Sequence, residues 1–278
     1  MKETRAEYLA VDKLRPFDEH PFKVVDNEEM DQLTWSILTQ GLLTPLVVRP
    51  LPNGEYEVIS GHRRLHACKK AGIETVPALI YAIDRDAAAI ALVDSNLQRE
   101  HILPSEKAFA YKLKLEAMNH QGRTAGQVGQ KWTRDEIAEG ESGRQVQRYI
   151  RLTNLIPGIL QKVDEGRIAL TPAVELSYLT DAEQEDLLET MESEDCTPSL
   201  SQAIQMKTLS QSGQLDMDKI FSIMTQPKAN QQEKISFKVS ELRDFFPRHY
   251  TAAQMMQEIL LAVKERQQRL ARQRDHSR

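Results

Sequence analysis

Apolar and polar residues follow two different periods in the first hundred residues of the chain. Alternation and short apolar runs predict β-strands at residues 7–14, 45–49, 55–59 and 76–82. Apolar residues spaced three and four apart predict helices at residues 28–41, 62–71 and 86–97. The turn Pro52-Asn53-Gly54 predicts a hairpin, because Asn-Gly tolerates positive φ angles. Short strands mixed with short helices predict an α+β domain over residues 1–100.

Beyond residue 100 the pattern becomes helical. We predict helices at residues 104–118, 133–139, 142–152, 159–164, 171–179 and 181–192, with a polar loop over 119–131. These helices are assigned to one all-α domain, residues 101–195.

The remaining residues change composition again. Residues 196–232 are rich in Ser, Gln and Thr, so we predict a linker there, with a weak helix near residues 200–209. Residues 233–278 are predicted to form a mostly helical C-terminal region, in which Thr251 caps a helix. The apolar face of that helix can pack on its own region or on a second copy of the chain, so dimerisation is one of two open outcomes.

Two of the predicted helices begin with capping boxes and lie close together. The boxes are Thr133-Arg-Asp-Glu136 and Ser142-Gly-Arg-Gln145, separated by a tight Gly140-Glu141 turn. This layout is typical of a helix-turn-helix, although a solvated helical hairpin is the alternative. Arg and Gln suit guanine edges, adenine edges and phosphates. The predicted contacts to double-stranded DNA are Thr133, Ser142, Arg144, Gln145, Gln147, Arg148 and Arg151.

Composition narrows the class of protein. The 278 residues are 40% hydrophobic and 28% charged, which is typical of a soluble globular protein. The net charge of -5 means that any DNA contact comes from a local basic face. Cys68 and Cys196 form no CxxC pair, which argues against a disulfide framework and fits a reducing cytoplasm. No apolar run approaches the ~20 residues of a membrane span, and the first residues lack the apolar core of a signal peptide.

One stretch has a distinctive charge pattern, the transition from strand to helix at Ser60-Gly61. His62, Arg63 and Arg64 place cations in the first turn of the helix, where the helix dipole is already positive. A bound anion, most simply a phosphate, explains donors and cations gathered there. A surface turn whose arginines pair with Asp or Glu is the other explanation, and the local sequence leaves both open.

Three blocks together resemble the nucleotide-binding boxes of ParB-type partition proteins. They are Gly41-Leu-Leu-Thr-Pro-Leu-Val-Val-Arg49, Ser60-Gly-His-Arg-Arg64 and Ser95-Asn-Leu-Gln-Arg-Glu100. Their order, their spacing and the helix-turn-helix that follows are similar to that family over residues 5–180. The family's usual C-terminal dimerisation domain has no clear counterpart in residues 195–278. The resemblance implies a ParB/sulfiredoxin-like N-terminal fold.

The resemblance also implies a function. Family members are dimers that load onto a palindromic DNA site, bind CTP with magnesium, close into a sliding clamp and work with a ParA-type ATPase. Carried over by position, the expected nucleotide-binding residues are Thr44, Pro45, Leu46, Val47, Arg49, Ser60, Gly61, His62, Arg63, Arg64, Asn96 and Arg99. Asn96 is expected to help coordinate Mg²⁺.

Two positions depart from the family pattern. His62 stands where the central box usually has Glu, and Ser95 stands where the third box usually has Glu. Neither side chain replaces a carboxylate beside magnesium. We therefore expect nucleotide binding but at most a weak CTPase, and we assign no catalytic residue.

Other functions share this predicted architecture. A sulfiredoxin-type reductase is disfavoured because Gly61 occupies the position of its catalytic Cys, and a nuclease is disfavoured for lack of an acidic metal cluster. A site-specific transcription regulator or nucleoid-associated factor without a segregation role stays open. A neighbouring ParA-type gene, or palindromic repeats nearby, favours partition.

Overall fold

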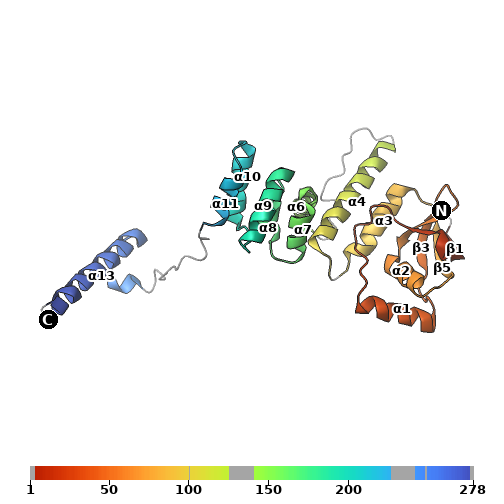
Figure 1. Cartoon of the computed structure of the whole chain (residues 1–278), viewed down its shortest axis with the longest axis horizontal. Coiled ribbons are helices and arrows are strands. Elements are labelled where there is room, and N and C mark those ends of the chain that lie inside the picture. Colours follow the sequence, from red (N-terminus) through yellow and green to blue (C-terminus); the bar gives the residue numbers. More distant parts are fainter. Residues whose placement is uncertain (1–3, 100, 125–140, 227–241, 248, 276–278) are drawn as a thin grey trace. The chain divides into compact units, whose positions relative to one another are not determined.

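The structure is a computed structural model that describes residues 4–99, 101–124, 141–226, 242–247 and 249–275. The chain divides into two compact units, Met1–Gln226 and Pro227–Arg278, of which the first contains a sheet and a series of helices (Figure 1). In the part of the chain that is described, no helix is long and apolar enough to cross a membrane.

The first domain is built on a five-stranded mixed sheet with the order β1-β5-β3-β4-β2. The strands are β1 (Thr4–Ala10), β2 (Leu14–Pro16), β3 (Leu46–Pro50), β4 (Tyr56–Ser60) and β5 (Thr75–Tyr81). The pairs β1/β5 and β3/β4 are antiparallel, whereas β3/β5 and β2/β4 are parallel. A 3-10 turn, η1 (Val11–Lys13), separates β1 from β2. The predicted hairpin is confirmed, with Gly54 at a φ of 79° between β3 and β4.

Helices cover both faces of this sheet. One face packs on α1 (Glu28–Gln40) and α2 (His62–Lys70), and the other packs on α3 (Arg85–Leu97) and α4 (Pro104–Thr124). Successive strand residues point to opposite faces, so Leu46 and Val48 join the first core and Val47 joins the second. Side chains cap both α1 and α3, because Asn27 accepts from the Met30 N–H and Asp84 accepts from the Ala87 N–H.

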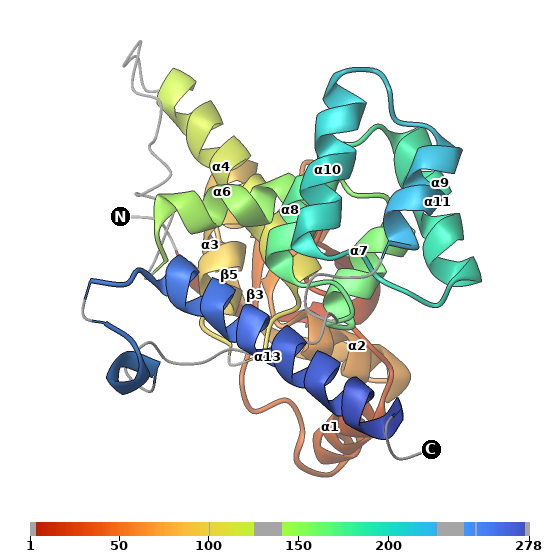
Figure 2. The same cartoon turned by 90° about the vertical axis from the view of Figure 1, so that its left-hand side faces the viewer.

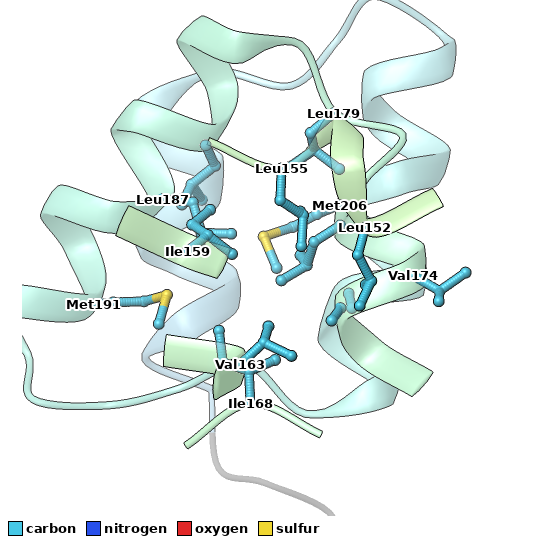
Figure 3. Close-up of a cluster of buried hydrophobic side chains, with 14 of the residues drawn as sticks. Leu152, Leu155, Ile159, Val163, Ile168, Val174, Leu179, Leu187, Met191 and Met206 are labelled. Carbon is cyan, nitrogen blue, oxygen red and sulfur yellow. The ribbon is translucent and has the colours of Figure 1, made fainter. Parts of the chain in front are cut away.

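A helical domain follows in the same unit. Its further helices are α6 (Gly143–Arg151), η2 (Leu152–Asn154), α7 (Pro157–Asp164), α8 (Leu170–Leu176), α9 (Asp181–Ser193), α10 (Leu200–Gln211) and α11 (Met217–Met224). Their shared core includes the fully buried Leu152, Ile159 and Leu187 (Figure 3). The α+β domain and the helical domain therefore agree with the predicted fold class.

Two sequence-based boundaries differ from the structure. The linker expected over 196–232 is wrong up to Gln226, because α10 and α11 bury Ala203, Met206, Ile220 and Ile223 in the helical core. The polar composition of this segment gave no sign that its helices are buried. Gln202 is an example, because it is buried and its side-chain N–H donates to the Ile223 carbonyl at 2.7 Å. The loop expected from residue 119 also begins too early, because α4 continues to Thr124.

The described part of the second unit contains a long helix, α13 (Ala252–Asp275), preceded by a 3-10 turn, η3 (Arg243–Phe245). The predicted cap is confirmed, because Thr251 Oγ1 accepts from the Gln254 N–H at 3.4 Å. Met255 is buried, but Met256, Leu260 and Val263 are exposed. Residues 235–239, whose alternating polar and apolar pattern is typical of a short strand, lie outside the described residues.

Candidate functional site

The first feature of the site is the glycine between β4 and α2. Gly61 is the N-cap of α2 and has a left-handed φ of 104°. A Cβ atom there would lie 2.6 Å from Leu46 Cδ2 and 3.0 Å from an Arg64 guanidinium nitrogen. The first N–H groups of α2 have no partner within their own helix. Only glycine therefore brings this helix start so close to the segment that contains Thr44 and Leu46.

Arg64 connects the central box with the first box. One guanidinium nitrogen donates to the Thr44 carbonyl at 2.6 Å and to the Pro45 carbonyl at 2.9 Å. Burial lowers the pKa of the Arg64 guanidinium from its usual value. Arg64 therefore braces the segment before β3 and holds Thr44 and Pro45 beside the start of α2.

Arg63 makes a different kind of contact. Its guanidinium pairs with Glu29, in the first turn of α1, at 3.0 Å, and the two side chains are 41% and 70% exposed. An exposed pair of this kind contributes only about 0–1 kcal/mol. The sequence left two explanations open for Arg63, a bound anion and a carboxylate partner. The structure contains a carboxylate partner, Glu29, but the pair is weak enough for a more highly charged anion to displace it.

Arg99, from the third box, lies near the same point. It follows α3 and stacks over the Phe22 ring at 5.4 Å. Burial and the nearby charge of Arg63 both lower the pKa of Arg99, whereas Glu106 raises it. The charge of Arg99 in turn helps to lower the pKa values of His20 and His62. The fold thus brings cations from the second and third boxes together, and such convergence is typical of anion sites.

His62 itself is held in a neutral form. Burial, followed by the charges of His20 and Arg99, lowers its pKa from 6.5 to about 3. Its Nε2 accepts from the Phe17 N–H at 3.2 Å. Because a neutral imidazole carries one proton and Nε2 is the acceptor, the Nδ1 atom carries that proton. Neither nitrogen of His62 is therefore free to bind a metal or take up a proton.

A pocket of about 280 Å³ lies between residues 16–24 and one face of α2. It is lined by Pro16, His20, Phe22, Val24, His62, Leu65, His66 and Lys69. The His20 and His62 rings lie 3.8 Å apart, and His20 Nδ1 donates to the Phe22 carbonyl at 2.6 Å. Flat rings beside a cationic cluster suit a ligand that joins an aromatic ring to phosphates. Sequence reasoning missed this segment, for which the aromatic pattern of His20-Pro21-Phe22 was the available signal.

The other residues of the first box lie mainly in the core. Leu46 is fully buried, and Val47 packs under α3. Arg49 pairs with Glu57 across the β3–β4 hairpin at 2.6 Å, and these side chains are only 13% and 7% exposed. The structure thus brings the Thr44–Pro45 segment to the start of α2, but holds Arg49 in a buried ion pair.

The third box offers few oxygen ligands. Asn96 is 4% exposed and its amide nitrogen donates to the Leu92 carbonyl at 2.7 Å, which leaves its amide oxygen as the atom suited to a cation. The Ser95 hydroxyl also donates to the Leu92 carbonyl. The Asp94 carboxylate lies 2.6 Å from the ammonium group of Lys114, a side chain only 4% exposed. Among the described residues, no group of three or more His, Cys, Asp or Glu side chains could hold a metal.

The second candidate surface is α6. Ser142 caps this helix by accepting from the Gln145 N–H at 3.3 Å, and the fully buried Val146 packs against Tyr111 of α4. Arg144 is exposed, whereas Gln145, Gln147, Arg148 and Arg151 are half-buried. Thr133 and the first helix of the predicted pair lie outside the described residues.

The arginines of α6 are fixed by α8. Arg148 donates to the Thr171 hydroxyl at 2.6 Å and to the Gln145 side chain at 3.2 Å. Arg151 donates to the Ser177 carbonyl at 2.6 Å. Within the described ranges, no carboxylate forms an ion pair with these arginines. They therefore form a positive face that is already ordered, as a polyanion-binding surface requires.

Comparison with known proteins gives one consistent result. Residues 1–97 match the model of the ParB N-terminal domain. A probable chromosome-partitioning protein ParB from Vibrio cholerae is 30% identical over 238 residues, which cover 84% of this chain and 77% of that protein. The chromosome-partitioning protein Spo0J of Thermus thermophilus is 36% identical over 181 residues, 65% of this chain and 61% of that one.

A solved structure is also similar. C-terminally truncated ParB from Caulobacter crescentus, complexed with CTP-γ-S, is 25% identical with a TM-score of 0.33, over 68% of this chain and 99% of that chain. The N-terminal mixed sheet, covered by helices on both faces and followed by a helical domain, is the fold of a ParB-like protein. The chain belongs to the family of ParB-type partition proteins.

Proposed function

We propose that this chain binds a specific DNA site through α6 and uses a bound nucleotide as a clamp switch in segregating a chromosome, plasmid or mobile element. The observation that carries the proposal is the convergence of Arg63, Arg99 and the N-terminus of α2 at Gly61. Cations gathered from distant segments create a local positive potential that attracts an anion. A triphosphate supplies that anion and displaces Glu29 from Arg63.

The proposed nucleotide is CTP, as the three boxes of the family imply. The base is assigned to the pocket between residues 16–24 and α2, because its aromatic and imidazole rings can stack on a pyrimidine. Mg²⁺ would be held by the Asn96 amide oxygen together with the phosphates, since this ion is usually bound partly through substrate phosphates. When bound, it would offset the charge of the phosphates.

Replacing Arg63 tests the nucleotide site. Arg63→Ala is expected to abolish measurable CTP binding in calorimetry, because a charge-assisted hydrogen bond to phosphate contributes about 1.5–3 kcal/mol. The matched control is Arg167→Ala in the helical domain, which removes an exposed arginine that also pairs with a carboxylate, Asp195, at 3.1 Å. Unchanged affinity in Arg63→Ala, or equal losses in both variants, would contradict the site.

Turnover of the nucleotide is expected to be slow or absent. The side chains at the positions of the family's acids are already engaged, since His62 Nε2 accepts from the Phe17 N–H and the Ser95 hydroxyl donates to the Leu92 carbonyl. Asp94 is held by Lys114 and cannot replace them. A phosphate-release assay with CTP, Mg²⁺ and DNA measures this, and robust hydrolysis would show that the assignment is wrong.

The DNA part of the proposal is tested by pulling down genomic fragments with the full chain, with and without each nucleotide. A homodimeric clamp that works in the cytoplasm is expected to enrich one palindromic site. Of the nucleotides tested, only CTP is expected to change that enrichment. Fragments clustered beside a ParA-type gene would support segregation. Sites spread over promoters would support the transcription regulator, and enrichment unaffected by any nucleotide would contradict the switch.

A further inference from the structure

One tyrosine in the helical domain is in contact with two cations. Tyr178 lies two residues beyond the end of α8, and its ring is 3.9 Å from the guanidinium carbon of Arg151 and 3.8 Å from the ammonium nitrogen of Lys207. One aromatic ring thus lies in cation–π contact with both positive charges. The stack joins three helices, α6, α8 and α10, which lie in succession in the domain (Figure 2).

Both cations are fixed by further contacts. Arg151 donates to the Ser177 carbonyl at 2.6 Å and to its hydroxyl at 3.2 Å, and Ser177 is buried. Lys207 pairs with Glu175 at 2.8 Å, and both of these side chains are 24% exposed. The two long side chains have therefore already lost the rotamer freedom that binding would otherwise remove.

The stack is continuous with the positive face of α6. Arg151 lies seven, four and three residues after Arg144, Gln147 and Arg148, which places all of them on one side of the helix. Tyr178 is 41% exposed, so the edge of the stack reaches solvent. The basic face of α6 thus extends over the end of α8 to Lys207 on α10.

We propose that Tyr178 is a positioning residue that holds Arg151 and Lys207 as a pair of contacts to the phosphate backbone of duplex DNA. In this arrangement Lys207 on α10 contacts the phosphate backbone of the duplex, and α6 faces the base edges of the same duplex. The proposal rests on the proposed DNA-binding function. Duplex DNA is the partner that fits, because Arg and Gln side chains suited to base edges share this surface.

Salt dependence of binding tests the proposal. Each phosphate contact contributes about 0.9 to the slope of log K against log salt concentration. The full chain is titrated with the DNA fragment recovered by pull-down, and with a random duplex of equal length, over a series of salt concentrations. Tyr178→Leu is expected to weaken binding about tenfold and make the slope shallower by about one to two, because both cations lose their aromatic partner.

Two companion variants separate positioning from general damage. Tyr178→Phe keeps the aromatic face and is expected to bind within about twofold of the parent with an unchanged slope. Lys207→Met is expected to make the slope shallower by about one. Lys219→Met, on α11, removes an exposed lysine that pairs with Asp216, and is expected to change nothing.

The outcomes distinguish this proposal from the wider function. If the parent chain binds no duplex, the proposed DNA-binding function fails. If the parent binds with a steep slope that Tyr178→Leu and Lys207→Met leave unchanged, the positioning role alone is wrong. An equal loss in Tyr178→Leu and Tyr178→Phe would also overturn it. Melting temperatures identify any variant that is simply unfolded, in which case Lys207→Met decides.

Discussion

Gly61→Ala is expected to eliminate nucleotide binding and to destabilise the first domain. The new methyl group would lie 2.6 Å from the buried Leu46 side chain and 3.0 Å from the Arg64 guanidinium. It would also force a non-glycine residue to a φ of 104°, at a cost of about 1–3 kcal/mol. Relief of this strain moves Arg64 away from the Thr44 and Pro45 carbonyls, so the start of α2 no longer faces the first box. Calorimetry with CTP and thermal unfolding measure the two effects.

Gly72→Ala is the matched control at the other end of α2. Gly72 also has a positive φ, 69°, but a Cβ atom there meets nothing within 4 Å. The control is expected to lower stability through the backbone alone, by about 1 kcal/mol, and to leave CTP binding intact. If both variants lose CTP binding equally, the close approach at Gly61 does not matter for the site. If Gly61→Ala binds CTP with unchanged affinity, the N-terminus of α2 is not part of the nucleotide site.

Glu57→Leu is expected to destabilise the first domain by about 3–5 kcal/mol, because it leaves the Arg49 charge buried without its partner. It also removes the acceptor that faces the Asp18 N–H at 3.5 Å. Chemical denaturation followed by circular dichroism measures this loss. A change below 1 kcal/mol would mean that Arg49 finds solvent or another partner.

The double variant Arg49→Met/Glu57→Leu separates structure from ligand binding at the same position. Replacing both charges by apolar groups is often neutral for stability, so most of the loss is expected to be recovered. If the recovered protein still binds CTP with the parent affinity, Arg49 serves the hairpin. If it is stable but no longer binds CTP, Arg49 is a nucleotide contact despite its ion pair with Glu57.

Local signals predicted most of the first domain. The Asn-Gly turn, the Asn27 and Asp84 caps and the Gly41 stop each depend on a few neighbouring residues, and each lies where the sequence indicated. The central turn at Gly61 was also recognisable, because the requirement for glycine and the cations after it are adjacent in sequence. The local sequence could not show which carboxylate or carbonyl group each arginine contacts.

Those partners come from distant segments. Glu57 binds Arg49 only because the register of the β3–β4 hairpin puts them opposite each other. The pocket beside His62 needs residues 16–24, which carry little periodic pattern. The helix expected near residues 200–209 agrees with α10, but its burial and the helix α11 were missed. Polar residues such as Gln202 are buried and satisfied there, while Ser and Gln dominate the composition.

The helix α4 has a mechanical consequence for the whole unit. One side of it packs under α3 through Leu113 and Ala117, while Tyr111 contacts Val146 of α6. Its 21 residues make a rod of about 30 Å. The residues that face α3 and the residue that faces α6 lie on the same turns of this rod. A displacement of α3 near Asn96 that moves these turns of α4 therefore also moves the surface on which α6 packs.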